Sequence, residues 1–186
     1  MTTQKSPAHW AQDVLYFWFA ELQPNDWFSG SAAVDQAIRS RFGNLYQALQ
    51  ASPLLPTSLE ARSLLAAVIL FDQFPRNLFR GSAAAYATDA RALELARHAV
   101  ATGADRSLKD QERHFLYMPF MHSEDRAMQA ESLRLFAQLS TDGLQCATHH
   151  RRIVERFGRF PHRNAIVGRS STPEELEFLK NESSFA

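Results

Sequence analysis

The sequence has a single cysteine, no excess of either charge and no long apolar run. Cys146 has no second cysteine to pair with, which excludes an internal disulfide. The 20 Lys and Arg residues balance 20 Asp and Glu residues, so no long-range field attracts nucleic acid or an anionic membrane. The longest strongly apolar run, 64–71, is far shorter than the roughly 20 residues that span a bilayer. We therefore expect no nucleic-acid partner and no membrane partner.

The length and the first residues suggest one intracellular domain. The N-terminal segment MTTQKSPAHW lacks the apolar run of a signal peptide, so we expect a cytoplasmic protein. A chain of 186 residues is long enough to bury a substantial core, and no Pro-rich or Gly-rich linker divides it. We expect a single domain over 1–186, with an ordered core at about 8–181 and a short polar tail at 182–186.

Apolar residues recur at helical spacing along most of the chain, beginning with Trp10, Val14 and Phe17. No run alternates apolar and polar residues for long enough to predict a strand. We therefore predict an all-α fold of about eight helices, arranged as antiparallel helical hairpins because the connecting loops are short. Trp27 and Phe28 follow the first helix, and we expect them to fold back over its end as part of the core.

Prolines and cap residues predict several helix boundaries. Thr57 and Glu60 have the spacing of a capping box at the start of a nearly all-apolar helix. Pro75 is expected to end that helix, and Pro119 to end a later one, because proline has no N–H to donate. These boundaries leave polar segments directly after both prolines.

Two further helix starts are predicted from side chains that accept backbone hydrogen bonds. Ser123 is expected to cap a helix that has Glu124 and Asp125 in its first turn, where the helix dipole favours negative charge. Thr172 and Glu175 have the spacing of a second capping box. We expect the last helix to begin there.

Two similar stretches, LFDQFPRN and RFGRFPHRN, place polar side chains where an apolar helix meets Phe-Pro. Asp72 lies in the first, where burial and the helix dipole both oppose a carboxylate, so it requires a cationic partner. Arg76 is near in sequence, while Arg159 and Arg163 come within reach if the two stretches pack together. The resulting ion pairs are either a structural staple between two hairpins or part of a ligand site.

A third polar segment, MPFMHSED, adds His122 and Glu124. A helix N-terminus favours anions, and a histidine titrates near neutral pH, but a simple N-cap with solvated acids is the alternative. Cys146 and His150 share a helix face, where core packing explains them better than a nucleophile pair. The histidine spacing matches no metal motif, so we predict no metal and no cofactor.

Three motifs in this order resemble the bacterial family catalogued as domain of unknown function 924. They are LFDQFPRNLFRGSAAAYATDARAL, FLYMPFMHSED and HRRIVERFGRFPHRNAIVGRSSTPEELEFL, and the likeness runs from about Val14 to Phe185. The resemblance implies a fold similar to tetratricopeptide-repeat arrays and implies no established activity. The polar motif residues of that family fall on Asp72, Gln73, Arg76, Asn77, Arg80, Asp89, His122, Ser123, Glu124, Gln129, Arg159, His162, Arg163, Asn164, Arg169 and Thr172.

Polar side chains at interrupted helix ends beside aromatic walls are typical of small-molecule sites. The leading hypothesis is therefore a pocket for a small anionic or polar ligand. One alternative is a tetratricopeptide-like scaffold that binds a peptide on its concave face. A second is a metal-independent hydrolase with His122 or His162 as its acid–base group. A homo-oligomer is compatible with each. The candidate ligand-binding residues are Asp72, Arg76, Asn77, His122, Glu124, Arg159, His162, Arg163 and Asn164.

Overall fold

The computed structural model describes residues 7–52 and 54–181, and the predicted polar tail at 182–186 lies outside them. All regular elements in these ranges are helical, which confirms the all-α prediction. The α-helices are α1 (Pro7–Tyr16), α2 (Ala32–Ala51), α3 (Ala61–Val68), α4 (Phe74–Leu78), α5 (Asp89–Thr102), α6 (Asp110–His122), α7 (Arg126–Phe136), α8 (Thr141–Phe157) and α9 (Pro173–Asn181). The π segments are η1 (Phe17–Glu21) and η4 (Ile69–Gln73), and the 3-10 segments are η2 (Pro24–Trp27), η3 (Pro56–Ser58), η5 (Ala83–Tyr86), η6 (Ala104–Ser107) and η7 (Pro161–Arg163).

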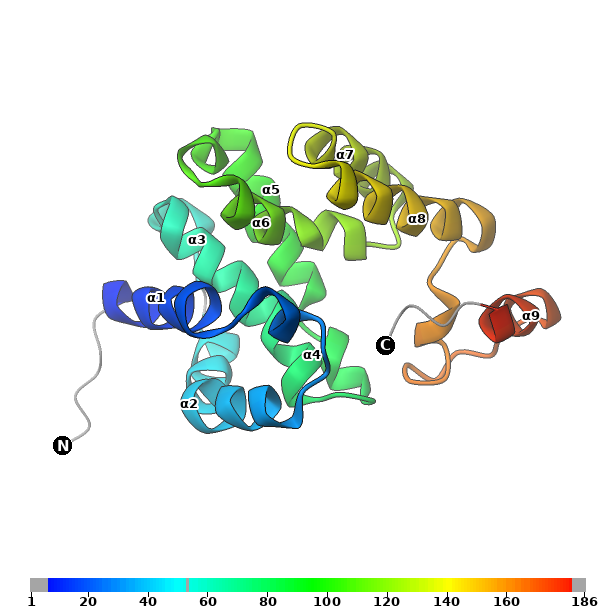
Figure 1. The fold of residues 1–186 in the computed structure, drawn as a ribbon, viewed down its shortest axis with the longest axis horizontal. Coiled ribbons are helices and arrows are strands. Elements are labelled where there is room, and N and C mark those ends of the chain that lie inside the picture. The colour runs from blue at the N-terminus through cyan, green and yellow to red at the C-terminus, as the bar shows by residue number, and fades with distance from the viewer. Residues whose placement is uncertain (1–6, 53, 182–186) are drawn as a thin grey trace.

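The apolar helix α3 lies at the centre of the fold and packs against α1, α5 and α6 (Figure 1). Every side chain from 64 to 71 is buried. Each large aliphatic or aromatic side chain in this run contributes about 1.5–3 kcal/mol through burial. The nearly all-apolar segment predicted to be helical is therefore helical and buried over 64–71, whereas Arg62 near its start is exposed.

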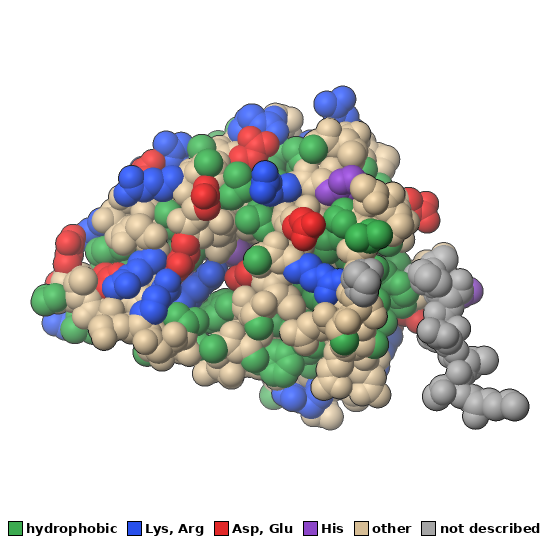
Figure 2. Space-filling model, turned by 180° about the vertical axis from the view of Figure 1, so that it is seen from behind, with side chains coloured by type: hydrophobic (Ala, Val, Ile, Leu, Met, Phe, Trp, Pro, Cys, Tyr) green, Lys and Arg blue, Asp and Glu red, His purple; other side chains and the backbone are tan. Residues whose placement is uncertain are grey.

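Helices that follow one another along the chain pack together, α5 on α6, α6 on α7 and α7 on α8 (Figure 1). This packing agrees with short loops between antiparallel neighbours. The tetratricopeptide-like arrangement and the single-domain boundaries stay predictions. The face shown in Figure 2 carries Lys and Arg side chains among Asp and Glu side chains, as expected for a chain with no net charge.

The central helix continues through η4 into α4, so the prediction that Pro75 ends it is wrong. In the π turn the N–H of Phe74 bonds to the carbonyl of Ile69, five residues back. This wider turn places Pro75 in the first turn of α4, where its missing N–H is not needed. The chain therefore stays helical to Leu78.

Pro119 lies inside α6, so the prediction that it ends this helix is also wrong. The helix runs on to His122, and the N–H of Ser123 bonds to the carbonyl of Phe120 at 3.4 Å. Met118, Pro119 and Phe120 are all buried. Packing of these side chains outweighs the one helical hydrogen bond that proline removes.

Two predicted caps are wrong as well. Asp125 caps α7 in place of Ser123, because its carboxylate accepts two backbone N–H groups at 2.7 and 3.0 Å. Glu124 consequently lies before the helix rather than in its first turn. The capping box of Thr57 and Glu60 does not form, since a 3-10 turn takes up 56–58 and Glu60 caps α3 without a side-chain bond.

The inner stripe of α8 is shifted from the predicted one. Cys146 is exposed, and its neighbour Ala147 is buried instead, so the prediction of a core cysteine is wrong. The buried positions are Gly143, Ala147, Ile153 and Val154, which lie on one helix face.

Beyond α8 the chain turns at Gly158, whose φ of +72° lies in the left-handed region that favours glycine. A small apolar cluster of Ile153, Val154 and Phe160 joins the end of α8 to the segment that carries η7 and α9 (Figure 1). The predicted second capping box is confirmed. The N–H of Thr172 donates to Glu175 at 2.7 Å, and the N–H of Glu175 donates to the Thr172 hydroxyl at 3.2 Å.

Candidate functional site

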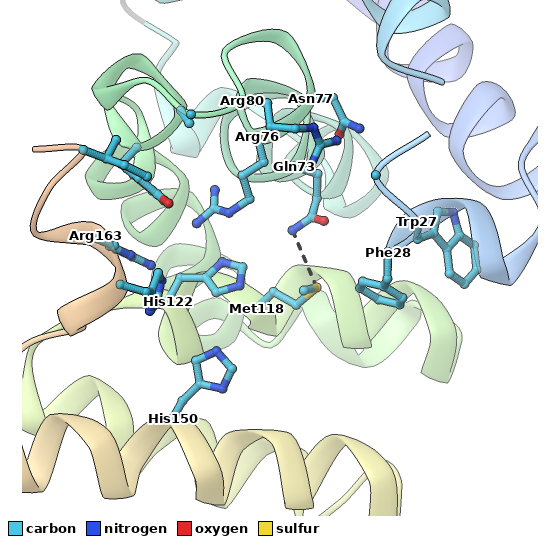
Figure 3. Close-up of a pocket in the computed structure, with 16 residues that line it drawn as sticks. Trp27, Phe28, Gln73, Arg76, Asn77, Arg80, Met118, His122, His150 and Arg163 are labelled. Atoms are coloured by element: carbon cyan, nitrogen blue, oxygen red, sulfur yellow. Dashed lines mark hydrogen bonds between the residues drawn. The ribbon is translucent and has the colours of Figure 1, made fainter. Parts of the chain in front are cut away.

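A cavity of about 430 Å³ lies where α4, α6, α8 and η7 meet, with Trp27 and Phe28 at its far end (Figure 3). Arg76 reaches it from α4 and Arg163 from η7, while His122 comes from α6. The two Phe-Pro stretches therefore meet in space, as the ligand-site hypothesis requires. Asn77 and His162, two other candidates, also line this cavity.

The wall of the cavity is cationic and rich in hydrogen-bond donors. Among the described residues that line it are three arginines and three histidines, and none is Asp or Glu. The carboxylates that balance this charge lie behind the arginines. These donors therefore attract a negatively charged group that enters the cavity.

Asp72 is the most buried of these carboxylates, with a side chain that is 0% exposed. It accepts hydrogen bonds from His122 Nδ1 at 2.8 Å and from Gln73 Nε2, and it lies 3.5 Å from Arg76 Nη1. Burial by itself would raise the pKa of Asp72, but Arg76 and His122 outweigh burial and hold it well below the usual value. The predicted cationic partner of Asp72 is therefore present.

The π segment η4 brings both Asp72 and Gln73 to α6. The Gln73 amide lies 3.6 Å from the sulfur of Met118 (Figure 3). Asp72 reaches His122 one turn further along α6. A π turn holds more residues than an α turn, so adjacent side chains diverge less around the axis. Both Asp72 and Gln73 therefore point toward the same neighbouring helix, α6.

Asp89 links the two Phe-Pro stretches. Arg76 binds its carboxylate through two parallel bonds of 3.0 and 3.1 Å, and Arg163 Nη1 approaches it at 3.4 Å. Asp89 stands in the first turn of α5, where the helix dipole favours a negative charge. Thr88 fixes that helix start by donating to the Phe71 carbonyl at 2.7 Å.

Arg163 is held between two aromatic rings. Its guanidinium carbon lies 4.6 Å from the centre of the Tyr86 ring and 4.7 Å from that of Phe160. The residue is 9% exposed, and burial lowers the pKa of its guanidinium. Its Nε is buried and has no hydrogen-bond acceptor among the described residues. Arg163 therefore has donor capacity that Asp89 does not use.

The three histidines have distinct roles around the cavity. Because His122 Nδ1 binds Asp72, Nε2 is the ring nitrogen that remains for a group in the cavity. Burial lowers the pKa of His150 to about 3, and burial together with Arg163 lowers that of His162 to about 4. Both rings are therefore uncharged at neutral pH.

Three candidate residues lie outside the cavity and fasten the segment that carries η7. Arg159 binds Glu175 at 2.6 Å, and Asn164 donates to the same carboxylate at 3.2 Å. Glu124 accepts two bonds from Arg169, at 2.7 and 2.9 Å. The structural staple is thus present at these positions. Arg76 and Arg163 line the cavity instead, and their role in a ligand site stays a prediction.

The model of a family described as bacterial protein of unknown function, DUF924, matches residues 14–183. The chain belongs to this family. A solved structure, that of the protein of unknown function ATU0120 from Agrobacterium tumefaciens, is 42% identical to it and superimposes with a TM-score of 0.90. That match covers 95% of this chain and 100% of the other. No curated protein matches the chain.

Several cavity residues of this DUF924 protein were not candidates from the sequence. Tyr86 had been given no role, and Trp27 and Phe28 had been assigned to the core. Asp35 was also missed. It accepts from Asn77 at 2.7 Å and from Arg80 at 2.9 Å, and thereby orients two wall donors. The sequence does indicate that a polar residue such as Arg80 needs a carboxylate partner. It does not indicate that this partner is Asp35 in α2, because no spacing rule connects the two segments.

Metal ligation is not a feature of the described residues, which contain no group of three His, Cys, Asp or Glu side chains arranged around an ion. None of the helices in the described ranges combines the length and the apolar character of a membrane span. The guanidinium groups of the three arginines in the wall have only N–H donors and a fixed positive charge, so the wall favours an anion over a metal cation.

Proposed function

We propose that this DUF924 protein binds a small anionic ligand in the cavity between α4, α6 and η7. The supporting observation is that arginine and histidine line the cavity while every nearby carboxylate stands behind them. Arg163 and His122 provide the direct contacts, because both line the cavity and His122 Nε2 is not taken up by Asp72. The His122 contact requires the imidazolium form, in which both ring nitrogens donate. Arg76 adds charge but already binds Asp89 with both terminal nitrogens.

Thermal unfolding with added phosphate, short carboxylates and nucleotides tests this proposal. A ligand at 100 times its dissociation constant stabilises the native state by about 2.7 kcal/mol. For a chain of this length that corresponds to a rise in Tm of about 5–10 °C. We expect the rise in the wild type and its loss in Arg163→Gln.

Arg134→Gln is the matched control, because Arg134 is exposed, pairs with Glu131 and does not line the cavity. It should keep the full ligand-induced rise. The proposal is wrong if none of these anions stabilises the wild type, or if the rise is the same in Arg163→Gln as in Arg134→Gln.

A second candidate function is general acid–base catalysis by His122, the enzymatic alternative from the sequence. The observation in its favour is the bond from His122 Nδ1 to the buried Asp72 carboxylate, which orients the imidazole as in known acid–base pairs. Among the described residues, the cavity wall contains no Ser, Thr or Cys. The attacking group would therefore be a water molecule from which His122 Nε2 removes a proton.

Panels of ester, amide and phosphate substrates test this candidate. His122→Gln should reduce kcat to the uncatalysed level, beyond the weaker anion binding that follows from losing the His122 contact, and His162→Gln should retain turnover. Equal turnover in wild type and His122→Gln, or none in wild type, rejects the catalytic role. The peptide-scaffold alternative stays a prediction that no contact among the described residues favours.

A further inference from the structure

A second cavity, of about 260 Å³, adjoins the cationic one. Trp27 and Phe28 line both cavities. The remaining wall of the second cavity comes from α6 and from the connection between α7 and α8, and includes Phe115 and Leu139. Most of its surface is apolar. The two cavities are therefore neighbours that share two aromatic residues, and three arginines line the first but not the second.

The charges near the second cavity do not oppose an apolar occupant. Asp110 belongs to its wall, but the side chain is 78% exposed and pairs with Arg113 at 3.4 Å. Burial lowers the pKa of His114, so this ring is uncharged at neutral pH. Neither group places a fixed charge inside the apolar space.

Phe28 stands at the junction of the cavities and is unusually exposed for its size, at 61%. Its ring stacks on Phe115 with centroids 6.4 Å apart, while Trp27 beside it is anchored by a 2.9 Å bond to the Trp18 carbonyl. Trp27 therefore has a fixed position, and Phe28 presents an open aromatic face. Burying that face against a ligand would contribute hydrophobic free energy to binding.

The close-up shows how the two chemistries are ordered along the site. Arg163 and His122 lie at one end, Trp27 and Phe28 at the other, and Gln73 and Met118 between them (Figure 3). Methionine is flexible and polarisable, and it adapts to apolar ligands of varied shape. The path from the cationic end to Phe28 therefore passes beside an adaptable apolar side chain.

We propose that the ligand is an amphiphilic anion. Its charged head binds Arg163 and His122, and its apolar chain passes Met118 and Phe28 into the cavity lined by Phe115. This inference rests on the proposed function and names the class of ligand that the same site would take. Carboxylic acids and phosphate monoesters with an aliphatic chain both have this chemistry.

Isothermal titration calorimetry with n-alkyl carboxylates from acetate to decanoate, below micelle-forming concentrations, tests the inference. Each methylene that enters the second cavity should tighten binding about fourfold. The same alkyl chains carrying a phosphate head distinguish the two sources of the anion. Decyltrimethylammonium, with a matched chain and a cationic head, should not bind.

Two variants test the charged head and the apolar chain of the ligand separately. Arg163→Gln should weaken all carboxylates by a similar factor and preserve the dependence on chain length. Phe28→Ala should leave acetate affinity unchanged and flatten the gain from longer chains. Tyr16→Ala is its control, because Tyr16 is similarly exposed, at 64%, and lines neither cavity. Circular dichroism checks that each variant folds.

The possible outcomes decide the two proposals separately. If acetate binds but affinity is independent of chain length, the amphiphilic ligand is refuted and the anion site stands. Equal binding of decanoate and decyltrimethylammonium also refutes it, because apolar adhesion alone explains that result. If no anion of any length binds, both proposals are refuted.

Discussion

Replacing Asp72 with asparagine is the sharpest perturbation of the polar network. The Asp72 side chain is fully buried and has contacts with His122, Gln73 and Arg76. Removing one charge from a buried, paired cluster costs about 3–5 kcal/mol, since its partners are left without compensation. Asparagine keeps one acceptor oxygen for His122, and Arg76 keeps its two bonds to Asp89. We therefore expect the lower end of that range, about 3 kcal/mol.

Urea unfolding followed by circular dichroism measures this loss. For a chain of this length, about 3 kcal/mol lowers the Tm by about 6–12 °C. Glu131→Gln is the control, because Glu131 pairs with Arg134 at the surface and such pairs contribute about 0–1 kcal/mol. If Asp72→Asn is no more destabilising than Glu131→Gln, the buried network does not stabilise the fold as described.

The pH dependence gives a second readout of the same variant. The pKa of Asp72 lies below its ordinary value of 3.8 in the folded chain, so its charge stabilises the native state above that pH. The difference in unfolding free energy between wild type and Asp72→Asn should be constant near neutrality and shrink below about pH 3.8. A difference that grows on acidification contradicts this assignment.

Three further predictions concern packing, titration and capping. Gly143→Ala should destabilise the chain by about 1–2 kcal/mol in urea unfolding, because the new Cβ would lie 2.7 Å from a buried phenylalanine ring. Gly43→Ala is the control, because no atom lies within 4 Å of its new Cβ, and it should stabilise the helix by about 0.5–1 kcal/mol. The low pKa values of His150 and His162 predict that the free energy of unfolding falls as pH drops from 6.5 toward 4, because the unfolded chain takes up protons that the folded chain does not. The fall is at most about 1.4 kcal/mol per pH unit for each histidine. His150→Phe should reduce this dependence of stability on pH, and an unchanged dependence would contradict the assignment. Thr172→Ala removes the N-cap of α9 and should cost about 1 kcal/mol, which thermal unfolding would detect; no change would mean that the cap is not formed in solution.

The sequence predicted the fold class and the need for a partner at Asp72, since both follow from local rules. Helical spacing of apolar residues marks a buried face, and a carboxylate in an apolar helix requires a cation wherever the helix packs. The identity of that partner was not predictable in this way. His122 lies 50 positions away, and only the packing of η4 against α6 brings the two residues together.

The errors of the sequence analysis also have physical causes. Pro75 and Pro119 were expected to end helices, but a preceding π turn accommodates the first and buried neighbours outweigh the second. Arg159 was grouped with Arg163 because both lie in the second Phe-Pro stretch. The chain is not a regular helix there, so Arg159 turns to Glu175 while Arg163 faces the cavity.

The most direct test of the anion site is a crystal structure of the wild type soaked with selenate, whose position is revealed by anomalous scattering. We expect a peak in the cavity within hydrogen-bond distance of Arg163 and His122, and no such peak in Arg163→Gln. Selenate found only at exposed arginines, with the cavity holding water alone, would contradict the proposal.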